Sequence, residues 1–201
     1  QGGARQAGYE FVRDIDLPGN AKKWAEEAVT KTEGDECPRG IMDLVLDPDH
    51  LALTMHESVG HPTESDRVLG WEANMAGRSF VSPSDVGSLK YAADRVSFTA
   101  NNRLQGGVGS WFYDDDGVIM QKFPIIRDGV LRNLSTTRET AAILGHERSN
   151  GCSRASGFDR FPINRIPNLY MEPGVQSDSD PEDLVEDVER GIYIQGQGSF
   201  S

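Results

Sequence analysis

The sequence predicts an α+β fold rich in antiparallel sheet, in which one histidine-bearing helix and a few short helices flank the strands. Two observations lead to this prediction. Apolar residues recur at helical spacing over residues 18–31 and again over residues 49–60. Beyond residue 95, short β-prone segments alternate with turn dipeptides such as Asp116-Gly117 and Asp128-Gly129, a pattern typical of antiparallel hairpins.

The first 80 residues predict a lead-in followed by helices. Residues 8–12 alternate in polarity and predict a short strand, whereas residues 18–31 predict a helix. Residues 41–46 form an apolar run that predicts a buried strand. A second helix is expected over residues 49–60, and residues 65–77 fit no single pattern.

The remaining elements are expected to be short. They are strands at residues 96–99, 110–113, 119–127, 130–135 and 168–171, and helices at residues 138–144 and 178–190. The last of these helices is acidic, and its apolar positions, Leu184, Val185 and Val188, are expected to face inward. A final strand begins at residues 192–194 with no visible partner, and such an unpaired edge favours association.

All 201 residues are interpreted as one domain, which is an ordinary size for a single hydrophobic core. Residues 1–40 form the lead-in strand and helix, residues 41–80 the helical region with the histidines, and residues 81–201 the sheet-rich part. No internal repeat and no long linker divides these parts.

Charge and cysteine content exclude several classes of function. Lys and Arg number 20 against 32 Asp and Glu, and the net charge of −12 disfavours direct binding to nucleic acids or anionic membranes. No run of 18 apolar residues predicts a transmembrane helix. Two cysteines, Cys37 and Cys152, are too few for a disulfide framework, and the first residues lack a secretory signal. A cytoplasmic protein is expected.

One short motif carries the chemistry. Residues 56–61 read H-E-S-V-G-H and place His56, Glu57 and His61 within six residues. Imidazole nitrogen is a common zinc ligand, and a catalytic zinc site needs about three protein ligands and an open position for water. A carboxylate beside the metal can take a proton from that water. The motif thus offers two ligands and one general base.

The spacing of the two histidines requires a distortion of the helix. Five residues correspond to about 140° around an ideal α-helix, whereas four residues correspond to about 40°. Gly60 tolerates unusual backbone angles, and Pro62 disfavours helical angles at His61. A local π-bulge would also bring the imidazoles together. We therefore expect the helix to widen or to end between His56 and His61.

Other interpretations of these residues remain open from spacing alone. His56 and His61 are equally compatible with two separate hydrogen-bonded histidines near a helix end. Glu64 and Asp66 follow closely, and either holds a ligand imidazole in one tautomer or caps the next helix. Cys152 is a further candidate ligand.

The motif resembles H-E-[AS]-x-G-H of the TldD/PmbA family, metalloproteases historically labelled modulators of DNA gyrase. Further segments resemble the family in the same order and approximate spacing across residues 51–195. They are an acidic turn at 114–117, a strand and turn at 125–131, a helix pattern at 140–145, R-x-x-N-x-Y-x-x-P-G at 165–174 and G-I-Y at 191–193. PmbA-type members generally lack the two histidines, so the chain resembles the catalytic TldD type.

The resemblance implies a zinc-dependent peptidase of H-E-x-x-x-H type. His56 and His61 would bind Zn²⁺, and Glu57 would act as the general base. The family acts on short or unstructured peptides, which enter an enclosed chamber and bind as an added β-strand. The implied partners are a peptide substrate and either a PmbA-type subunit or further copies of this chain.

The resemblance also implies that the chain is a central fragment of a longer protein. The family's third zinc ligand is a Cys in a C-terminal C-G-K-type segment, which we expect beyond residue 201, and an N-terminal α/β domain is expected upstream. The fragment alone is then expected to be inactive. Two other functions remain as alternatives: a non-catalytic peptide-binding or assembly subunit, and a regulator of DNA gyrase.

Overall fold

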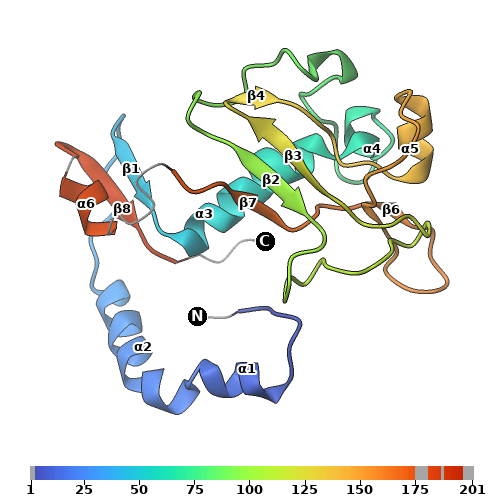
Figure 1. Cartoon of the computed structure of the whole chain (residues 1–201). Coiled ribbons are helices and arrows are strands. Elements are labelled where there is room, and N and C mark those ends of the chain that lie inside the picture. Colours follow the sequence, from blue (N-terminus) through green and yellow to red (C-terminus); the bar gives the residue numbers. More distant parts are fainter. Residues whose placement is uncertain (1–2, 175–180, 187, 197–201) are drawn as a thin grey trace.

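A computed structural model describes residues 3–174, 181–186 and 188–196, and it confirms the α+β fold rich in antiparallel sheet. The main sheet has four antiparallel strands in the order β4-β3-β2-β7, and helix α3 lies across one of its faces (Figure 1). The bounds of these elements are α3 (Pro48–Met55), β2 (Phe98–Asn101), β3 (Lys122–Arg127), β4 (Val130–Leu131) and β7 (Leu169–Met171).

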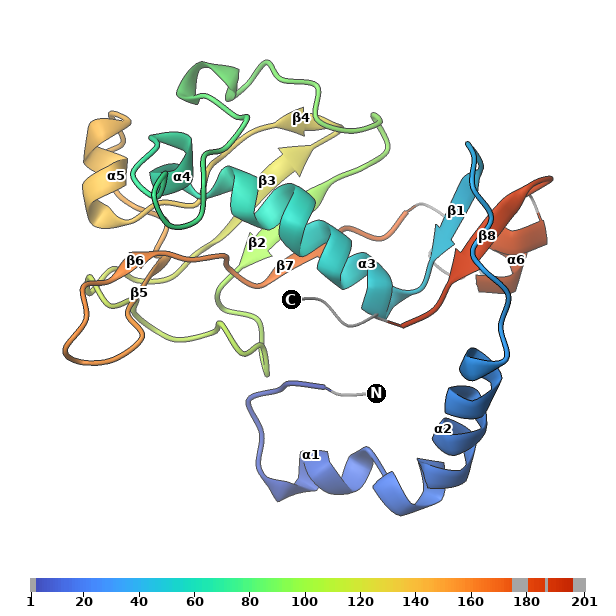
Figure 2. The ribbon, with the colours of Figure 1, turned by 180° about the vertical axis from the view of Figure 1, so that it is seen from behind.

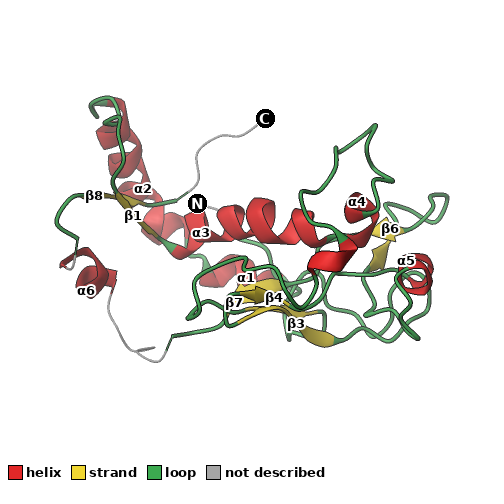
Figure 3. Ribbon diagram, turned by 90° about the horizontal axis from the view of Figure 1, so that it is seen from above, coloured by secondary structure: helices red, strands yellow, loops and turns green. Residues whose placement is uncertain are grey.

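The hydrophobic core lies between this sheet and the helical segment above it, as the view from above shows (Figure 3). Val59 is 5% exposed and belongs to the same cluster as Phe98, Ile125 and Ile126, and Met55 packs against it. Each such apolar side chain contributes about 1.5–3 kcal/mol when it is fully buried. Burial of Val59 therefore fixes which face of the segment turns away from the sheet.

A second, two-stranded sheet pairs β1 (Asp43–Leu46) in parallel with β8 (Gly191–Ile194). The last strand thus has a partner, which the sequence did not reveal because the two strands are far apart in the chain. The apolar run at residues 41–46 was predicted to be buried, but Ile41 is fully exposed and Leu44 is 57% exposed.

Hydrogen bonds tie this second sheet to the start of α3. Asp47 is the N-cap of α3, and its carboxylate accepts from the backbone N–H of His50 at 2.8 Å and of Gly196 at 2.8 Å. The Nδ1 of His50 lies 3.0 Å from the carbonyl oxygen of Gly196. The chain beyond β8 therefore anchors the first turn of α3.

Residues 9–32 contain two helices, α1 (Tyr9–Asp14) and α2 (Leu17–Thr32), which extend away from the rest of the chain (Figures 1 and 2). The prediction of a helix at 18–31 is confirmed, but the predicted strand at 8–12 is wrong. This segment belongs to α1 instead. The first turn of α1 is stabilised by the Glu10 carboxylate, which accepts from the Gly8 N–H at 2.7 Å. Neither helix buries a residue among those described.

The remaining short elements agree in part with the sequence. Helix α5 (Arg138–Ile143) is confirmed, and Thr137 caps it. The predicted strand at 110–113 is wrong, because only a single bridge joins Tyr113 to Ile119 there. Helix α4 lies in the segment 65–77 that fitted no single pattern, and the pair formed by β5 and β6 was not predicted. Their bounds are α4 (Ser65–Val68), β5 (Ser153–Arg154) and β6 (Ile163–Asn164).

The acidic helix near the C-terminus is shorter and more exposed than expected. Within the described residues it is α6 (Pro181–Glu186), and residues 178–180 and 187 of the predicted helix lie outside them. Leu184 is 56% exposed and Val185 is 44% exposed, so the prediction that both face inward is wrong. Across the described part of the chain, no helix combines the length and apolar character needed to cross a membrane.

The two Asp-Gly turns offer a matched test of backbone packing. Gly117 and Gly129 have φ of +75° and +74°, but a Cβ on Gly117 meets nothing within 4 Å. A Cβ on Gly129 would collide with the carbonyl oxygen of Ala92 and lie 2.8 Å from that of Ala93. We expect Gly117→Ala to lower the free energy of unfolding by about 1–2 kcal/mol. Gly129→Ala should cost about 1–3 kcal/mol more.

Urea denaturation of both variants measures the difference. An equal loss of unfolding free energy in the two variants would show that the carbonyl oxygens of Ala92 and Ala93 do not restrict the turn at Gly129.

Candidate metal centre

The helix that begins as α3 widens at the two histidines. It continues into a five-residue π-turn, η1 (His56–Gly60), and then into a short 3₁₀ turn, η2 (His61–Thr63). The backbone N–H of His61 donates to the carbonyl oxygen of His56, which is an i→i+5 hydrogen bond. This bond places residues five apart on one face, as four-residue spacing does in an α-helix. The expected widening between the histidines is confirmed.

Gly60 and Pro62 contribute in a different way than expected. Gly60 (φ −58°, ψ −67°) and His61 (φ −61°, ψ −43°) both keep right-handed helical angles. At Gly60 a Cβ would lie 3.0 Å from the Cδ1 and Cγ2 atoms of Ile166, so a larger residue there would force this side chain to shift. Pro62 lies in the first turn of η2, and the chain leaves helical geometry only at Glu64, where ψ is 120°.

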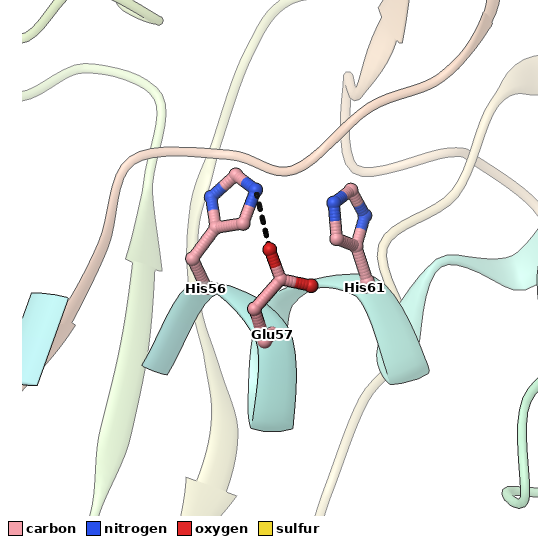
Figure 4. Close-up of side chains that lie close together, drawn as sticks. All are labelled: His56, Glu57 and His61. Carbon is pink, nitrogen blue, oxygen red and sulfur yellow. Dashed lines mark ion pairs between the residues drawn. The ribbon is translucent and has the colours of Figure 1, made fainter. Parts of the chain in front are cut away.

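The widened turn brings His56, Glu57 and His61 together, with one ligand atom of each within 4.8 Å of the others. The two imidazole rings are edge to face, with centroids 4.6 Å apart. The Nε2 of His56 lies 3.9 Å from Oε1 of Glu57, and all three side chains extend from the same side of the helix (Figure 4). Among the described residues, this is the one group of three potential metal ligands.

Glu64 fixes the orientation of the His61 ring. The Nδ1 of His61 lies 2.8 Å from Oε2 of Glu64, which leaves Nε2 free to face the cluster. Glu64 precedes α4, but its side chain makes no capping hydrogen bond to this helix. The residue is fully buried. The sequence left two roles open for Glu64, to hold a ligand imidazole or to cap the next helix. The structure supports the first, because Glu64 contacts His61 and does not cap α4.

A buried ion-pair network surrounds this carboxylate. The Nε of Arg67 lies 2.8 Å from Oε2 of Glu64 and 3.3 Å from Oε2 of Glu72. Burial raises the pKa of Glu64 to about 7, against the opposing effect of the positive charge of Arg67. Arg67 therefore offsets part of the cost of placing a carboxylate beneath the cluster.

The electrostatic surroundings keep both imidazoles neutral. Burial lowers the pKa of His56, and the neighbouring His61 lowers it further. Burial also lowers the pKa of His61, and the positive charge of Arg67 adds to this effect. A histidine whose pKa falls below its ordinary value presents an unprotonated nitrogen at neutral pH, which is the form that binds a metal ion.

The chain segment that leads into β7 passes over the imidazoles and is fastened to the helix beneath it (Figure 4). Asp66 accepts from the backbone N–H of Asn164 at 3.2 Å, and the backbone N–H of Ile166 lies close enough to Glu64 to lower the pKa of that carboxyl. Burial raises the pKa of Asp66 to about 6, and the nearby Glu72 adds to this shift. Asp66 thus acts as an anchor for this segment and is not a partner of an imidazole.

Cys152 lies outside the cluster of potential ligands. It is 1% exposed, and its sulfur accepts from Nδ2 of Asn102 at 3.4 Å. Burial raises the pKa of its thiol to about 12, so the thiolate form that binds metal is disfavoured. The described residues therefore supply two imidazoles and one carboxylate.

Sequence reasoning missed the residues that support the site from a distance. Glu72 carried no recognisable signal, whereas Arg67 stands three residues after Glu64, a spacing that allows a helical ion pair. Arg165 opens the R-x-x-N segment, but nothing in the sequence indicates that it raises the positive potential at both imidazoles.

The known proteins that this chain resembles in sequence are described as metallopeptidases or metalloproteases. Residues 39–200 match the domain family described as PmbA/TldA metallopeptidase C-terminal domain. A metalloprotease of Methanothermobacter thermautotrophicus is 31% identical over 189 residues, which cover 94% of this chain and 38% of the relative. A zinc metalloprotease TldD homolog of Saccharolobus solfataricus is 27% identical, with 94% of this chain and 40% of the relative covered. The chain thus spans about two fifths of these relatives.

Solved structures show the same fold at low sequence identity. TldE from Thermococcus kodakarensis has a TM-score of 0.65 and 20% identity, and the match covers 90% of this chain and 39% of TldE. A Bacteroides thetaiotaomicron protein described as a modulator of DNA gyrase has a TM-score of 0.62 and 19% identity, with 89% and 35% covered.

The contact between Gly60 and Ile166 can be tested in two backgrounds. We expect Gly60→Ala to lower the free energy of unfolding by about 1–3 kcal/mol, because its Cβ overpacks the Ile166 side chain. In an Ile166→Ala background the same change should be neutral or stabilising, since alanine favours helix over glycine. A double-mutant cycle by urea denaturation measures this coupling. The same loss in both backgrounds would contradict the steric explanation.

Proposed function

Because this chain belongs to the PmbA/TldA metallopeptidase family, we propose that it forms the zinc-binding part of a peptidase that cleaves short or unstructured peptides. The observation that carries the proposal is the π-turn, which brings His56, Glu57 and His61 within 4.8 Å of one another. Two neutral imidazoles and an exposed carboxylate are a donor set that suits zinc.

In this proposal His56 and His61 hold the metal ion through Nε2. Glu64 keeps the Nδ1 of His61 engaged and so presents Nε2 to the ion. A zinc ion held there supplies Lewis acidity toward a peptide carbonyl and lowers the pKa of a nearby water. A third protein ligand is expected from the remainder of the protein, as the relationship to zinc metalloproteases suggests.

Glu57 has the position of the general base. Its side chain is 62% exposed, and its carboxylate lies between the two imidazoles, where an attacking water would stand (Figure 4). It would take the proton from this water and pass it to the leaving nitrogen of the peptide. Its 3.9 Å separation from Nε2 of His56 is compatible with a metal ion about 2 Å from each atom.

The sheet provides a place for an extended peptide. β7 is one of the two edge strands of the main sheet, and β2 is its one partner among the described strands. The segment leading into β7 passes over the imidazoles, so a peptide paired with this edge would run beside the proposed centre. Backbone pairing suits substrates that lack structure of their own. The likeness to TldE supports a partner subunit of the same fold.

The base assignment predicts a separation of metal binding from catalysis. In the intact protein, Glu57→Gln should lower kcat for peptide cleavage by about 10²–10⁴-fold, because the proton acceptor is removed. Its zinc content should stay that of the unchanged protein, since both histidines remain. Elemental analysis and a fluorogenic peptide assay measure the two quantities.

Two further variants complete this test. Glu147→Gln alters an exposed carboxylate away from the cluster and should leave both quantities unchanged. Full activity in Glu57→Gln would overturn the base assignment. Undiminished zinc in a His56→Ala, His61→Ala variant would overturn the metal site, and peptide binding without metal or cleavage would favour a non-catalytic subunit.

The role assigned to Glu64 predicts a graded loss of metal affinity. Glu64→Gln should weaken zinc binding by about 10–100-fold, because the imidazole of His61 loses a charged hydrogen-bond partner. Glu72→Gln removes the neighbouring carboxylate of the Arg67 network but leaves the His61 contact in place, and it should weaken binding less. Competition against a chromophoric chelator measures both affinities. Equal losses would assign the effect to the network as a whole.

A further inference from the structure

A pocket of about 400 Å³ lies beside β5 and β6, and two arginines line it. Its other walls come from the loop that joins these strands, including Phe161, which is 95% exposed. Arg154 belongs to β5, and Arg165 directly follows β6, the strand that pairs with β5. The pocket is therefore built on paired backbone, and a loop forms its remaining wall.

The two guanidinium groups differ in their partners. Nη2 of Arg154 donates to the carbonyl oxygen of Ile166 at 2.6 Å, which holds this side chain in place. Arg165 is half-buried, and within the described ranges its guanidinium makes no hydrogen bond or ion pair. Its backbone N–H donates to the carbonyl oxygen of Cys152 at 2.9 Å, so only its side chain is free. A half-buried cation without a partner is available to a ligand.

The two positive charges act on one another. Burial holds the pKa of Arg154 below its ordinary value, and the charge of Arg165 is the next largest cause. The acidic neighbours of Arg154 already have partners: Glu64 contacts His61, and Asp115 accepts from the backbone N–H of Ala155 at 2.6 Å. The pocket thus keeps an excess of positive charge in a chain whose net charge is −12.

The pocket adjoins the proposed metal centre. Arg165 is close enough to lower the pKa of both His56 and His61 through its charge. The next residue, Ile166, packs against Gly60 of the π-turn, and its backbone N–H lies close enough to Glu64 to lower the pKa of that carboxyl. A ligand that reaches the imidazoles along this segment therefore passes the free guanidinium.

We propose that Arg165, with Arg154 behind it, binds a carboxylate of the peptide and so selects substrates that carry one close to the metal centre. The planar guanidinium group of arginine donates two parallel hydrogen bonds to a carboxylate. This geometry makes arginine well suited to bind a carboxylate at this position. The carboxylate comes either from the C-terminus of the peptide or from an acidic side chain. This inference rests on the proposed function, because it specifies the substrate of the same site.

The test measures binding and does not depend on cleavage. Four fluorescein-labelled hexa-alanine peptides serve as probes: the free acid, the C-terminal amide, and two amides with glutamate or glutamine at one internal position. Fluorescence polarisation gives the Kd of each for the intact protein carrying Glu57→Gln, with and without chelator. The comparison adds Arg165→Ala, Arg165→Gln and the control Arg160→Ala, which removes an exposed arginine paired with Asp159 on the same loop.

Arg165→Ala and Arg165→Gln should each weaken carboxylate-bearing peptides by about tenfold or more. The uncharged amides should change less than twofold, and Arg160→Ala should change nothing. Weakened binding of the free acid alone would show that Arg165 binds the C-terminal carboxylate of the peptide. Weakened binding of the glutamate amide alone would show that it binds an acidic side chain. Equal weakening of all four peptides, or of none, overturns the inference. Failure of cleavage or of zinc binding alone contradicts only the proposed function, because these affinities do not require either.

Discussion

The hydrogen bond from the His61 N–H to the His56 carbonyl oxygen is the constraint on which the site depends. In a regular α-helix these side chains would point about 140° apart, and no single ion could contact both. One extra residue in the turn removes that difference without a break in the helix. A π-turn has weaker backbone geometry than an α-helix, so the surrounding structure must hold it.

Two layers hold the widened turn. On one side, Val59 is buried against the main sheet and fixes the rotation of the helix about its axis. On the other side lies the segment before β7. Its Ile166 side chain packs against Gly60, and the backbone N–H of its Asn164 donates to Asp66. The imidazoles emerge between these layers, which explains why His61 is only 15% exposed while Glu57 remains open to solvent.

Much of the site could be predicted because its chemistry lies in six consecutive residues. The spacing of His56 and His61 required a distortion, and the structure contains it. The reason for Gly60 could not be predicted, since its neighbour Ile166 stands more than one hundred residues later. The same holds for Arg165, whose position near the imidazoles depends on how β6 pairs with β5. Local patterns carry no information about such contacts.

The fold shows the same division between local and distant information. Helix α2 and the Asp-Gly turns follow from short-range signals and were predicted, and Gly117 and Gly129 both have positive φ. Residues 8–12 alternate in polarity like a strand, yet they lie outside the core and form a helix stabilised by Glu10. Alternation predicts a strand only where one face of the segment is buried.

The parallel pairing of β1 with β8 has a consequence for how the protein is made. Asp43 lies opposite Gly191, so well over one hundred residues separate the two strands. Parallel pairing across such a distance forms slowly, because a long loop must close before any contact is gained. During synthesis α3 leaves the ribosome well over one hundred residues before Gly196, which anchors Asp47 and His50. The helix that bears the histidines therefore becomes fully anchored only after that later segment has been made.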